Sequence, residues 1–265
     1  MNEILKSVFP KATRTLIYRL RNYILGRIRV SRDFSTLKSQ SSLSKWSELF
    51  PFDRKSLVLD DFYDLAGIAA GHYFHQDIFV AREILKAQPR RHFDFGSRID
   101  GFISHLAVFR EVDVFDIRSL ETTEQNIRFH QLDIMDTSQV VKLEQVESLS
   151  CLHTAEHFGL GRYGDPIDFD GWEKGINNLT SLLVKGGILY FSTPVSHEQR
   201  IVFNAHRIFQ PKFLNEFFSD NFEILKTAMI EDSGQMNLSA DFTSEEFLSN
   251  FRGKYSCGIW VLRKK

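Results

Sequence analysis

The chain has 265 residues, of which 43% are hydrophobic and 25% are charged, and its formal net charge at pH 7 is −1. That length is enough for one large hydrophobic core with a terminal extension left over. A net charge this close to zero excludes a nucleic-acid binder that relies on overall positive charge, because neutralising several phosphates needs an excess of Lys and Arg. We therefore expect no nucleic-acid partner.

Cysteine content and hydropathy both favour a cytoplasmic protein. Cys151 and Cys257 lie far apart in apolar surroundings, which is typical of buried thiols in a reducing compartment. The sequence contains no zinc-ligand spacing, so we assign no metal ligands from it. No apolar run approaches the ~20 residues of a membrane span, and the N-terminus lacks the apolar core and cleavage site of a signal peptide.

The first segment of the chain is strongly basic. Between Met1 and Arg32 there are eight Lys or Arg residues against the single acid Glu3. From Thr13 to Arg29 apolar residues recur at helical spacing, which predicts a basic amphipathic helix. The residues of its apolar stripe are Leu16, Ile17, Leu20, Ile24 and Ile28. Such a helix can pack on its own domain, dock on a partner protein, or lie on an anionic membrane surface at the inner face of the membrane.

A polar segment separates this helix from the remainder of the chain. Residues 35–44 are rich in Ser, Lys and Gln and hold few large apolar side chains, which is typical of a linker. We therefore expect a helical extension with its linker over residues 1–50, followed by one catalytic-type domain over residues 51–265.

The rest of the chain alternates between predicted strands and helices, which indicates an α/β fold with a parallel sheet covered on both faces. The helices are predicted at residues 77–87, after Asp100, and at residues 172–184. The strands are predicted at residues 92–95, 112–116, 127–132, 148–152, 187–192, 222–229 and 256–263. No long helix is evident between the last two strands, so this pair can form an antiparallel edge.

The turn after the first strand suits a nucleotide-like cofactor. The segment from His92 to Gly101 reads as a strand, a turn that starts with Gly96, and a helix. Ligands of parallel sheets bind at the carboxyl ends of the strands, where a glycine lets the backbone approach closely. Ser97 and Arg98 stand where a glycine-rich fingerprint carries at least one more Gly, so an ordinary strand-to-helix turn is the alternative.

Two later strands end in acids. Asp116 lies about twenty residues after the turn, where a carboxylate can accept hydrogen bonds from both ribose hydroxyls. Asp133 follows the next strand and can accept a hydrogen bond from an adenine amino group, or it is a solvated loop residue. These acids strengthen the prediction of a cofactor crevice.

The densest group of polar residues follows the fourth predicted strand, at residues 150–166. Its candidates for chemistry are His153, Glu156, His157, Arg162 and Asp165. A histidine can act as a general base because its ordinary pKa of ~6.5 lies near neutrality, although either histidine can instead satisfy a buried carbonyl. A second polar segment, residues 195–209, follows the neighbouring strand, so both segments can line one substrate pocket.

Several segments resemble class I S-adenosylmethionine (SAM) dependent methyltransferases. The sequence DFGS at residues 94–97 is similar to their first motif, and Asp116 stands where they place their ribose-binding acid. Glu156-His157, residues 182–189 and Thr193-Pro194 resemble later motifs. Longer stretches resemble one bacterial family of methyltransferase-like proteins of unknown function, from residue 62 to the C-terminus: HYFHQD at 72–77, GSRIDGF at 96–102, DIR at 116–118, EHFGLGRYGDP at 156–166 and FNAHR at 203–207.

The resemblance implies a Rossmann-like fold and SAM as the cofactor. The fold has a mostly parallel seven-stranded sheet with an antiparallel last strand. The cofactor-binding residues that it implies are Asp94, Gly96, Ser97, Arg98, Asp116, Asp133 and His153. Arg98 departs from the superfamily, which normally has Gly near this position. Its guanidinium can pair with the carboxylate of the methionine moiety or with a phosphate on the substrate.

Members of this family are often associated with surface-polysaccharide biosynthesis, so the resemblance implies O-methylation of a sugar or glycan precursor. Because the sulfonium of SAM is already reactive, the protein mainly aligns the acceptor and removes its proton. We expect His157 or His206 to be the base, with Glu156 orienting it. The expected acceptor contacts are Arg162, Tyr163, Asp165, Asn204 and Arg207.

Two other functions remain open at this point. One is a catalytically silent Rossmann module that binds a nucleotide or nucleotide-sugar in a glycan-assembly complex, since one fold hosts many functions. The other is nicotinamide-dependent chemistry, which the missing glycines disfavour.

Overall fold

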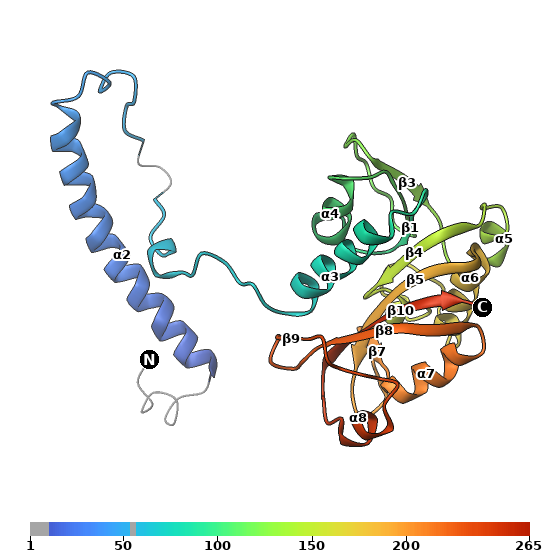
Figure 1. Ribbon diagram of the computed structural model, residues 1–265. Coiled ribbons are helices and arrows are strands. Elements are labelled where there is room, and N and C mark those ends of the chain that lie inside the picture. The colour runs from blue at the N-terminus through green and yellow to red at the C-terminus, as the bar shows by residue number, and fades with distance from the viewer. Residues whose placement is uncertain (1–10, 54–56) are drawn as a thin grey trace. The chain divides into compact units, whose positions relative to one another are not determined.

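The computed structural model describes residues 11–53 and 57–265 (Figure 1). The chain divides into two compact units, Met1–Ile68 and Ala69–Lys265. The predicted domain boundary after residue 50 thus falls inside the first unit.

The first unit contains the long helix α2 (Lys11–Ser41) and the short turn η1 (Asp61–Tyr63). The helix predicted from Thr13 to Arg29 is confirmed, but it continues through most of the expected linker, so the linker prediction was wrong as far as Ser41. The hydroxyls of Ser35 and Thr36 donate to backbone carbonyls one turn earlier, at 3.1 and 3.2 Å, as hydroxyls within helices commonly do. A polar composition therefore did not end the helix.

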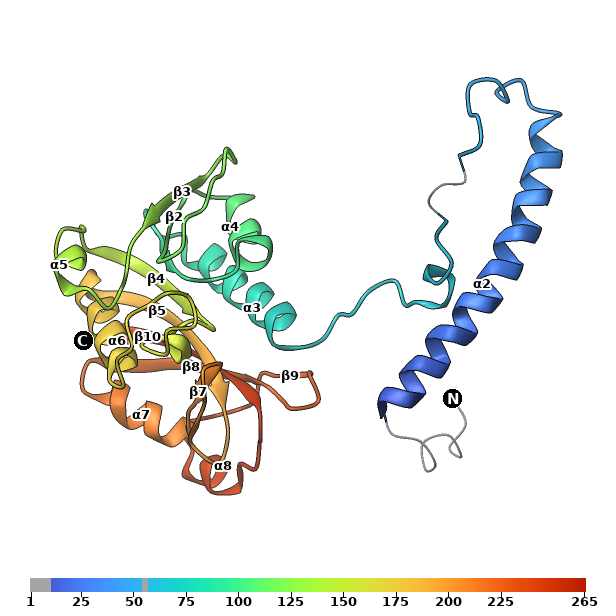
Figure 2. The same ribbon diagram turned by 180° about the vertical axis from the view of Figure 1, so that it is seen from behind.

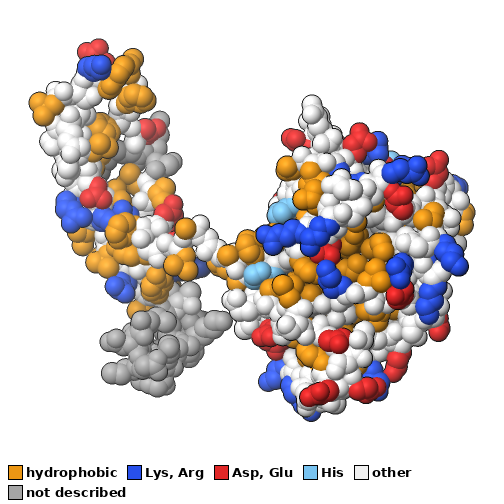
Figure 3. All heavy atoms as spheres, viewed as in Figure 1, with side chains coloured by type: hydrophobic (Ala, Val, Ile, Leu, Met, Phe, Trp, Pro, Cys, Tyr) orange, Lys and Arg blue, Asp and Glu red, His pale blue; other side chains and the backbone are white. Residues whose placement is uncertain are grey.

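Basic and hydrophobic side chains share the surface of α2 (Figure 3). Leu16, Leu20 and Ile28 of the predicted apolar stripe are exposed within this unit. None of the helices in the part of the chain that the structure describes is long and apolar enough to cross a membrane.

The second unit is built on an eight-stranded sheet in the order β3-β2-β1-β4-β5-β10-β8-β9. The strands are β1 (Phe93–Phe95), β2 (Val112–Asp116), β3 (Ile127–Gln131), β4 (Val146–Leu152), β5 (Leu183–Val195), β8 (Phe222–Ile230), β9 (Met236–Asn237) and β10 (Ser256–Lys264). Strands β1 to β5 are parallel, whereas β10 pairs antiparallel with both β5 and β8. The predicted mostly parallel sheet with an antiparallel last strand is confirmed.

Two details of the sheet differ from the prediction. The last strand, β10, lies between β5 and β8, so β8 and β10 do not together form an antiparallel edge of the sheet. The two-residue β9 adds an eighth strand beside β8. A separate hairpin of β6 (Arg200–Val202) and β7 (His206–Ile208), which the sequence did not predict, follows β5.

Helices cover both faces of the sheet (Figures 1 and 2). One hydrophobic cluster joins the sheet to α3 (His72–Ala87), the π-turn η2 (Ile99–Ile103) and α4 (Ser104–Ala107). The other joins it to α5 (Thr137–Val140), α6 (Gly171–Leu182) and α7 (Pro211–Ser219). Along β10, Trp260 belongs to one cluster and Ile259 and Val261 to the other, as alternation in a doubly covered strand requires. The short helix α8 (Glu245–Asn250) lies between β9 and β10 in the sequence.

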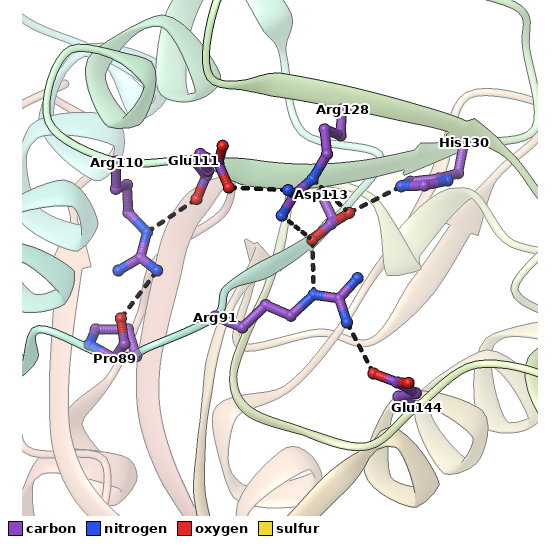
Figure 4. A network of polar contacts seen from close by, with 8 residues as sticks. All are labelled: Pro89, Arg91, Arg110, Glu111, Asp113, Arg128, His130 and Glu144. Atoms are coloured by element: carbon purple, nitrogen blue, oxygen red, sulfur yellow. Dashed lines mark hydrogen bonds and ion pairs between the residues drawn. The ribbon is translucent and has the colours of Figure 1, made fainter.

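A buried carboxylate ties together the strands at one side of the sheet (Figure 4). Asp113 of β2 accepts hydrogen bonds from Arg91 at 2.9 Å, from Arg128 at 3.2 Å and from His130 at 2.9 Å. Burial alone would raise the pKa of Asp113, but these three donors outweigh it and lower the pKa to about 2. Asp113 is therefore ionised at neutral pH.

Candidate functional site

A cavity of about 570 Å³ opens at the carboxyl ends of β1, β2 and β4. In this sheet order the chain reverses its direction of progress between β1 and β4, which is where ligands of open α/β sheets bind. The predicted site residues on the cavity wall are Gly96, Ser97, Arg98, Asp116, Asp133, His153, His157, Tyr163 and Asp165. The structure thus brings all of the proposed cofactor residues except Asp94, and part of the proposed substrate residues, to one cavity.

The turn after β1 is held by Asp94, which lies beneath the cavity and not on its wall. Its carboxylate accepts hydrogen bonds from the backbone N–H of Ser97 at 3.0 Å, the Ser97 hydroxyl at 2.6 Å and the Ser150 hydroxyl at 2.5 Å. Burial raises the pKa of Asp94 to about 7 even though these donors oppose the shift. The predicted role of Asp94 is therefore indirect, because this side chain shapes the loop.

Gly96 cannot be replaced in this turn without strain. Its φ of +73° lies in the left-handed region, and a Cβ at this position would collide with the side chain of Thr154. The same residue leaves bare backbone on the cavity wall, as a closely approaching ligand requires.

The predicted ribose acid is already engaged by a neighbour. Asp116 accepts hydrogen bonds from Arg118 at three positions: the backbone N–H at 2.8 Å, Nε at 3.0 Å and Nη2 at 2.7 Å. The guanidinium also lies over the ring of Tyr163, 4.4 Å from its centroid. Arg118 belongs to the Asp116-Ile117-Arg118 motif, but its role was not predicted from the sequence, although side chains two residues apart after a strand end can meet.

Arg98 and Asp133 lie on the wall in different settings. Arg98 pairs with Asp100 at 2.8 and 3.1 Å and lies over the ring of Tyr73, 4.9 Å from its centroid. Asp133 accepts a hydrogen bond from the backbone N–H of Met135 at 2.9 Å. Burial raises the pKa of Asp133. Tyr73 also lies on the cavity wall, a position that the sequence did not predict.

Glu156 contacts His153 in place of His157. Its carboxylate is buried and lies 2.8 Å from Nδ1 of His153, whereas Nε2 of His157 is 3.8 Å away, beyond hydrogen-bond distance. The expected orientation of His157 by Glu156 is therefore not what the structure shows. The contact is local, because Glu156 lies in the turn η3 (Ala155–His157), three residues after His153.

The Glu156–His153 pair is electrostatically coupled. Burial alone would lower the pKa of His153, but Cys257 and Glu156 beside it raise the pKa to about 10. Burial would raise the pKa of Glu156, and His153 outweighs this and lowers it. Both shifts favour a charged pair at the end of β4.

His157 is positioned as a base by a backbone carbonyl. Its Nδ1 lies 2.6 Å from the carbonyl oxygen of Ala205, and a donated N–H there leaves Nε2 with a free lone pair. Burial lowers the pKa of His157, so the ring stays neutral at neutral pH. His206, the other predicted base, lies on β7 outside the cavity wall, with its ring centroid 6.4 Å from that of His157.

Three predicted acceptor contacts do not line the cavity. Arg207 is buried and donates to the backbone carbonyls of Phe158 and Phe169, so the structure commits its side chain to this loop and not to the cavity wall. Arg162 donates to the Ala205 carbonyl at 2.8 Å, and Asn204 is exposed on the hairpin. All three residues stand near the site in the sequence, but Arg207 and Arg162 bind backbone carbonyls and Asn204 lies outside the cavity wall.

Comparison with protein families matches residues 112–265 to the family described as Caenorhabditis protein of unknown function, DUF268. The matched segment is more than half of the chain. The chain belongs to this family. The expected membership in a family of unknown function is thus confirmed. The expected bacterial origin of that family is not supported, because the description names Caenorhabditis. No curated protein matches the chain in sequence.

Solved structures share the fold of the DUF268 chain. One is a protein from Thermobifida fusca YX that is assumed to be a methyltransferase, with 11% identity and a TM-score of 0.50, covering 73% of this chain and 80% of that one. The N-methyltransferase NodS from Bradyrhizobium japonicum WM9, solved with S-adenosyl-L-homocysteine (SAH), has 13% identity and a TM-score of 0.49, and the match covers 73% of this chain and 88% of that one. A SAM-dependent methyltransferase from Clostridium acetobutylicum ATCC 824 has 11% identity and a TM-score of 0.48, and the match covers 72% of this chain and 91% of that one. At such identities the likeness shows the fold alone, the Rossmann-like fold of class I methyltransferases.

Proposed function

We propose that this chain binds SAM in the cavity at the ends of β1, β2 and β4 and transfers its methyl group to a hydroxyl of a sugar or surface-polysaccharide precursor. The observation that carries the proposal is the meeting of Gly96, Asp116 and Asp133 on one cavity wall at the point where the strand order reverses. Each of these residues comes from the loop after a different strand or from the strand end itself.

The residues of the cavity fit the parts of SAM. The bare backbone at Gly96 suits close contact with the methionine moiety, and Arg98 can pair with its carboxylate. Asp116 can accept from the ribose hydroxyls, and Asp133 from the adenine amino group. Phe129, beside these acids on the wall, supplies an apolar surface for the purine ring. When bound, SAM supplies an electrophilic methyl group.

The chain's own contribution to chemistry is removal of the acceptor proton. His157 lies on the wall, is held through Nδ1 by the Ala205 carbonyl, and carries a lone pair on Nε2. A neutral imidazole held in this way can take a proton from a hydroxyl within hydrogen-bond reach. Tyr163 and Asp165, also on the wall, are the proposed contacts for the acceptor's other hydroxyls.

The first test is calorimetric titration of the full chain with SAM and SAH. Asp116→Ala should abolish measurable binding while leaving the thermal unfolding temperature almost unchanged, because the substitution removes the ribose acceptor without opening a core cavity. Asp220→Ala, which replaces an exposed acid after α7, is the control and should bind as the wild type does. Unchanged affinity in Asp116→Ala would contradict the cofactor assignment.

The second test is transfer of labelled methyl from SAM to an extract of glycan precursors. Labelled saccharide is the expected product. Binding of SAM without transfer to any acceptor of a broad panel would favour the silent module that binds a nucleotide or nucleotide-sugar in a glycan-assembly complex.

A further inference from the structure

Three side chains from distant parts of the sequence meet next to the cavity. They are His72, the first residue of α3, His153, directly after β4, and Cys257 of β10. Each offers one ligand atom, and the three atoms lie within 4.8 Å of one another. From this cluster we propose a zinc site formed by His72, His153 and Cys257, which is independent of the proposed methyl transfer.

The feature that points to a bound ligand is a buried ring nitrogen of His153. Its side chain is only 4% exposed, and its Nε2 has no hydrogen-bond partner within residues 11–53 and 57–265. A buried ring nitrogen without a partner is unfavourable, because it has lost its contact with water and gained none in return. A metal ion bound at Nε2 supplies the missing contact.

The surroundings of His153 are those that orient a metal ligand. Glu156 is buried and binds Nδ1 of His153 at 2.8 Å, which leaves Nε2 for the metal. The ring of His72 stacks on the ring of His153, with centroids 5.2 Å apart and planes 18° apart. A carboxylate in the position of Glu156 fixes the ring orientation of a ligating histidine.

The donor set selects the class of metal. One cysteine sulfur and two imidazole nitrogens suit Zn²⁺, whereas Mg²⁺ and Ca²⁺ prefer oxygen ligands. Three protein ligands leave a fourth position for water or a substrate atom, as in catalytic zinc sites. His153 also belongs to the cavity wall, so an ion bound to it would lie at the edge of the cavity.

The spacing of these residues explains why the sequence offered no sign of the site. They stand at positions 72, 153 and 257, so no short motif joins them. The pairing of β10 with β5 brings Cys257 opposite Pro194 and so next to the end of β4, because β4 pairs with β5. Only the folded sheet creates the cluster.

The experiment uses the full chain after treatment with a chelator. Zn²⁺ is titrated calorimetrically, and Co²⁺ serves as a spectroscopic probe because it replaces zinc in tetrahedral sites. We expect one Zn²⁺ per chain, a rise in unfolding temperature on binding, and an absorption band for charge transfer from thiolate to Co²⁺. Wild-type protein that binds neither ion would overturn the proposal without any variant.

Matched variants identify the ligands. Cys257→Ala should lose the charge-transfer band, whereas Cys151→Ala, at the other buried cysteine in the opposite core cluster, should keep it. His72→Gln changes a half-buried residue and should weaken Zn²⁺ binding with the fold intact. Glu156→Gln should weaken it about 10- to 100-fold, as for other residues that support a ligating histidine. The same change tests whether the carboxylate orients His153.

Two results with folded variants would reject the assignment. The first is a charge-transfer band that survives Cys257→Ala, and the second is a Zn²⁺ affinity that His72→Gln leaves unchanged. Circular dichroism and thermal unfolding of each metal-free variant establish that it is folded. Because every readout is metal binding, the result does not depend on whether the chain transfers methyl groups.

Discussion

At the scale of single residues, His157 depends most on its neighbours for its proposed chemistry. The Ala205 carbonyl holds its Nδ1, and burial lowers its pKa. His157→Gln should therefore reduce methyl transfer about 10²- to 10⁴-fold while changing SAH affinity little. His206→Gln is the comparison, since that residue lies outside the cavity wall. Transfer that survives both substitutions would contradict both histidines and would point to Asp165, the other candidate base on the cavity wall.

The lowered pKa of His157 also sets an expectation for pH dependence. A base with a lowered pKa stays deprotonated at a more acidic pH than an ordinary histidine, whose pKa is ~6.5. The rate of transfer should therefore remain high through pH 6.5 and fall only below it. A pH–rate profile at saturating SAM measures this, and an acid limb centred above pH 6.5 would contradict the assignment of His157 as the base.

Arg118 competes with the proposed cofactor for Asp116. It already occupies three acceptor sites of the carboxylate, so both ribose hydroxyls can bind only when the guanidinium moves away. Because this ion pair is half-exposed, its loss should tighten SAH binding by about two- to fivefold in Arg118→Ala. Calorimetric titration at low and high salt measures the effect, which should shrink as salt screens the pair. Weaker binding in Arg118→Ala would mean that the arginine helps to hold the cofactor.

At the scale of elements, the residues that line the cavity all belong to the second unit, between Tyr73 and Asp165, whereas α2 belongs to the first unit. Deletion of residues 1–41 should therefore leave SAH affinity unchanged. The basic and apolar surface of α2 suits an anionic membrane, so the same deletion should abolish sedimentation with anionic vesicles. Zwitterionic vesicles are the control, and equal binding of the full chain to both kinds would contradict the electrostatic part of this proposal.

At the scale of the whole molecule, the Asp113 network joins residues before β1 with β2 and β3 (Figure 4). The pKa of Asp113 falls from its ordinary 3.8 to about 2 on folding, so its ionisation contributes about 2 kcal/mol to the free energy of unfolding at neutral pH. That contribution is fully present above about pH 4 and is lost as the pH falls through about 2.

Asp113→Asn should accordingly be less stable than the wild type by about 2 kcal/mol at pH 7 in urea denaturation, and the difference should diminish between about pH 4 and pH 2. Asp220→Asn, at an exposed position, should show no such difference. A gap between Asp113→Asn and the wild type that stays constant with pH would show that packing, and not ionisation, is the cause.

The sequence by itself determined most of the local elements and the first half of the proposed cofactor site. Apolar runs placed β2 at its observed bounds and most other strands within two residues of theirs, because burial on both faces of a sheet requires continuous apolar segments. The exception is β5, which extends over Leu183–Val195 instead of the predicted residues 187–192. The turn at Gly96 and the acid at Asp116 followed from the same pattern, since both stand directly at strand ends. These features depend on neighbours along the chain, which a sequence displays.

Only the tertiary structure decided which residues each side chain contacts. The insertion of β10 between β5 and β8, the contact of Glu156 with His153, and the burial of Arg207 under the loop carbonyls all join residues that periodicity cannot relate. The meeting of His72, His153 and Cys257 is the extreme case. Periodicity reports whether a residue is buried and on which face, whereas the atom it touches depends on segments folded from far along the chain.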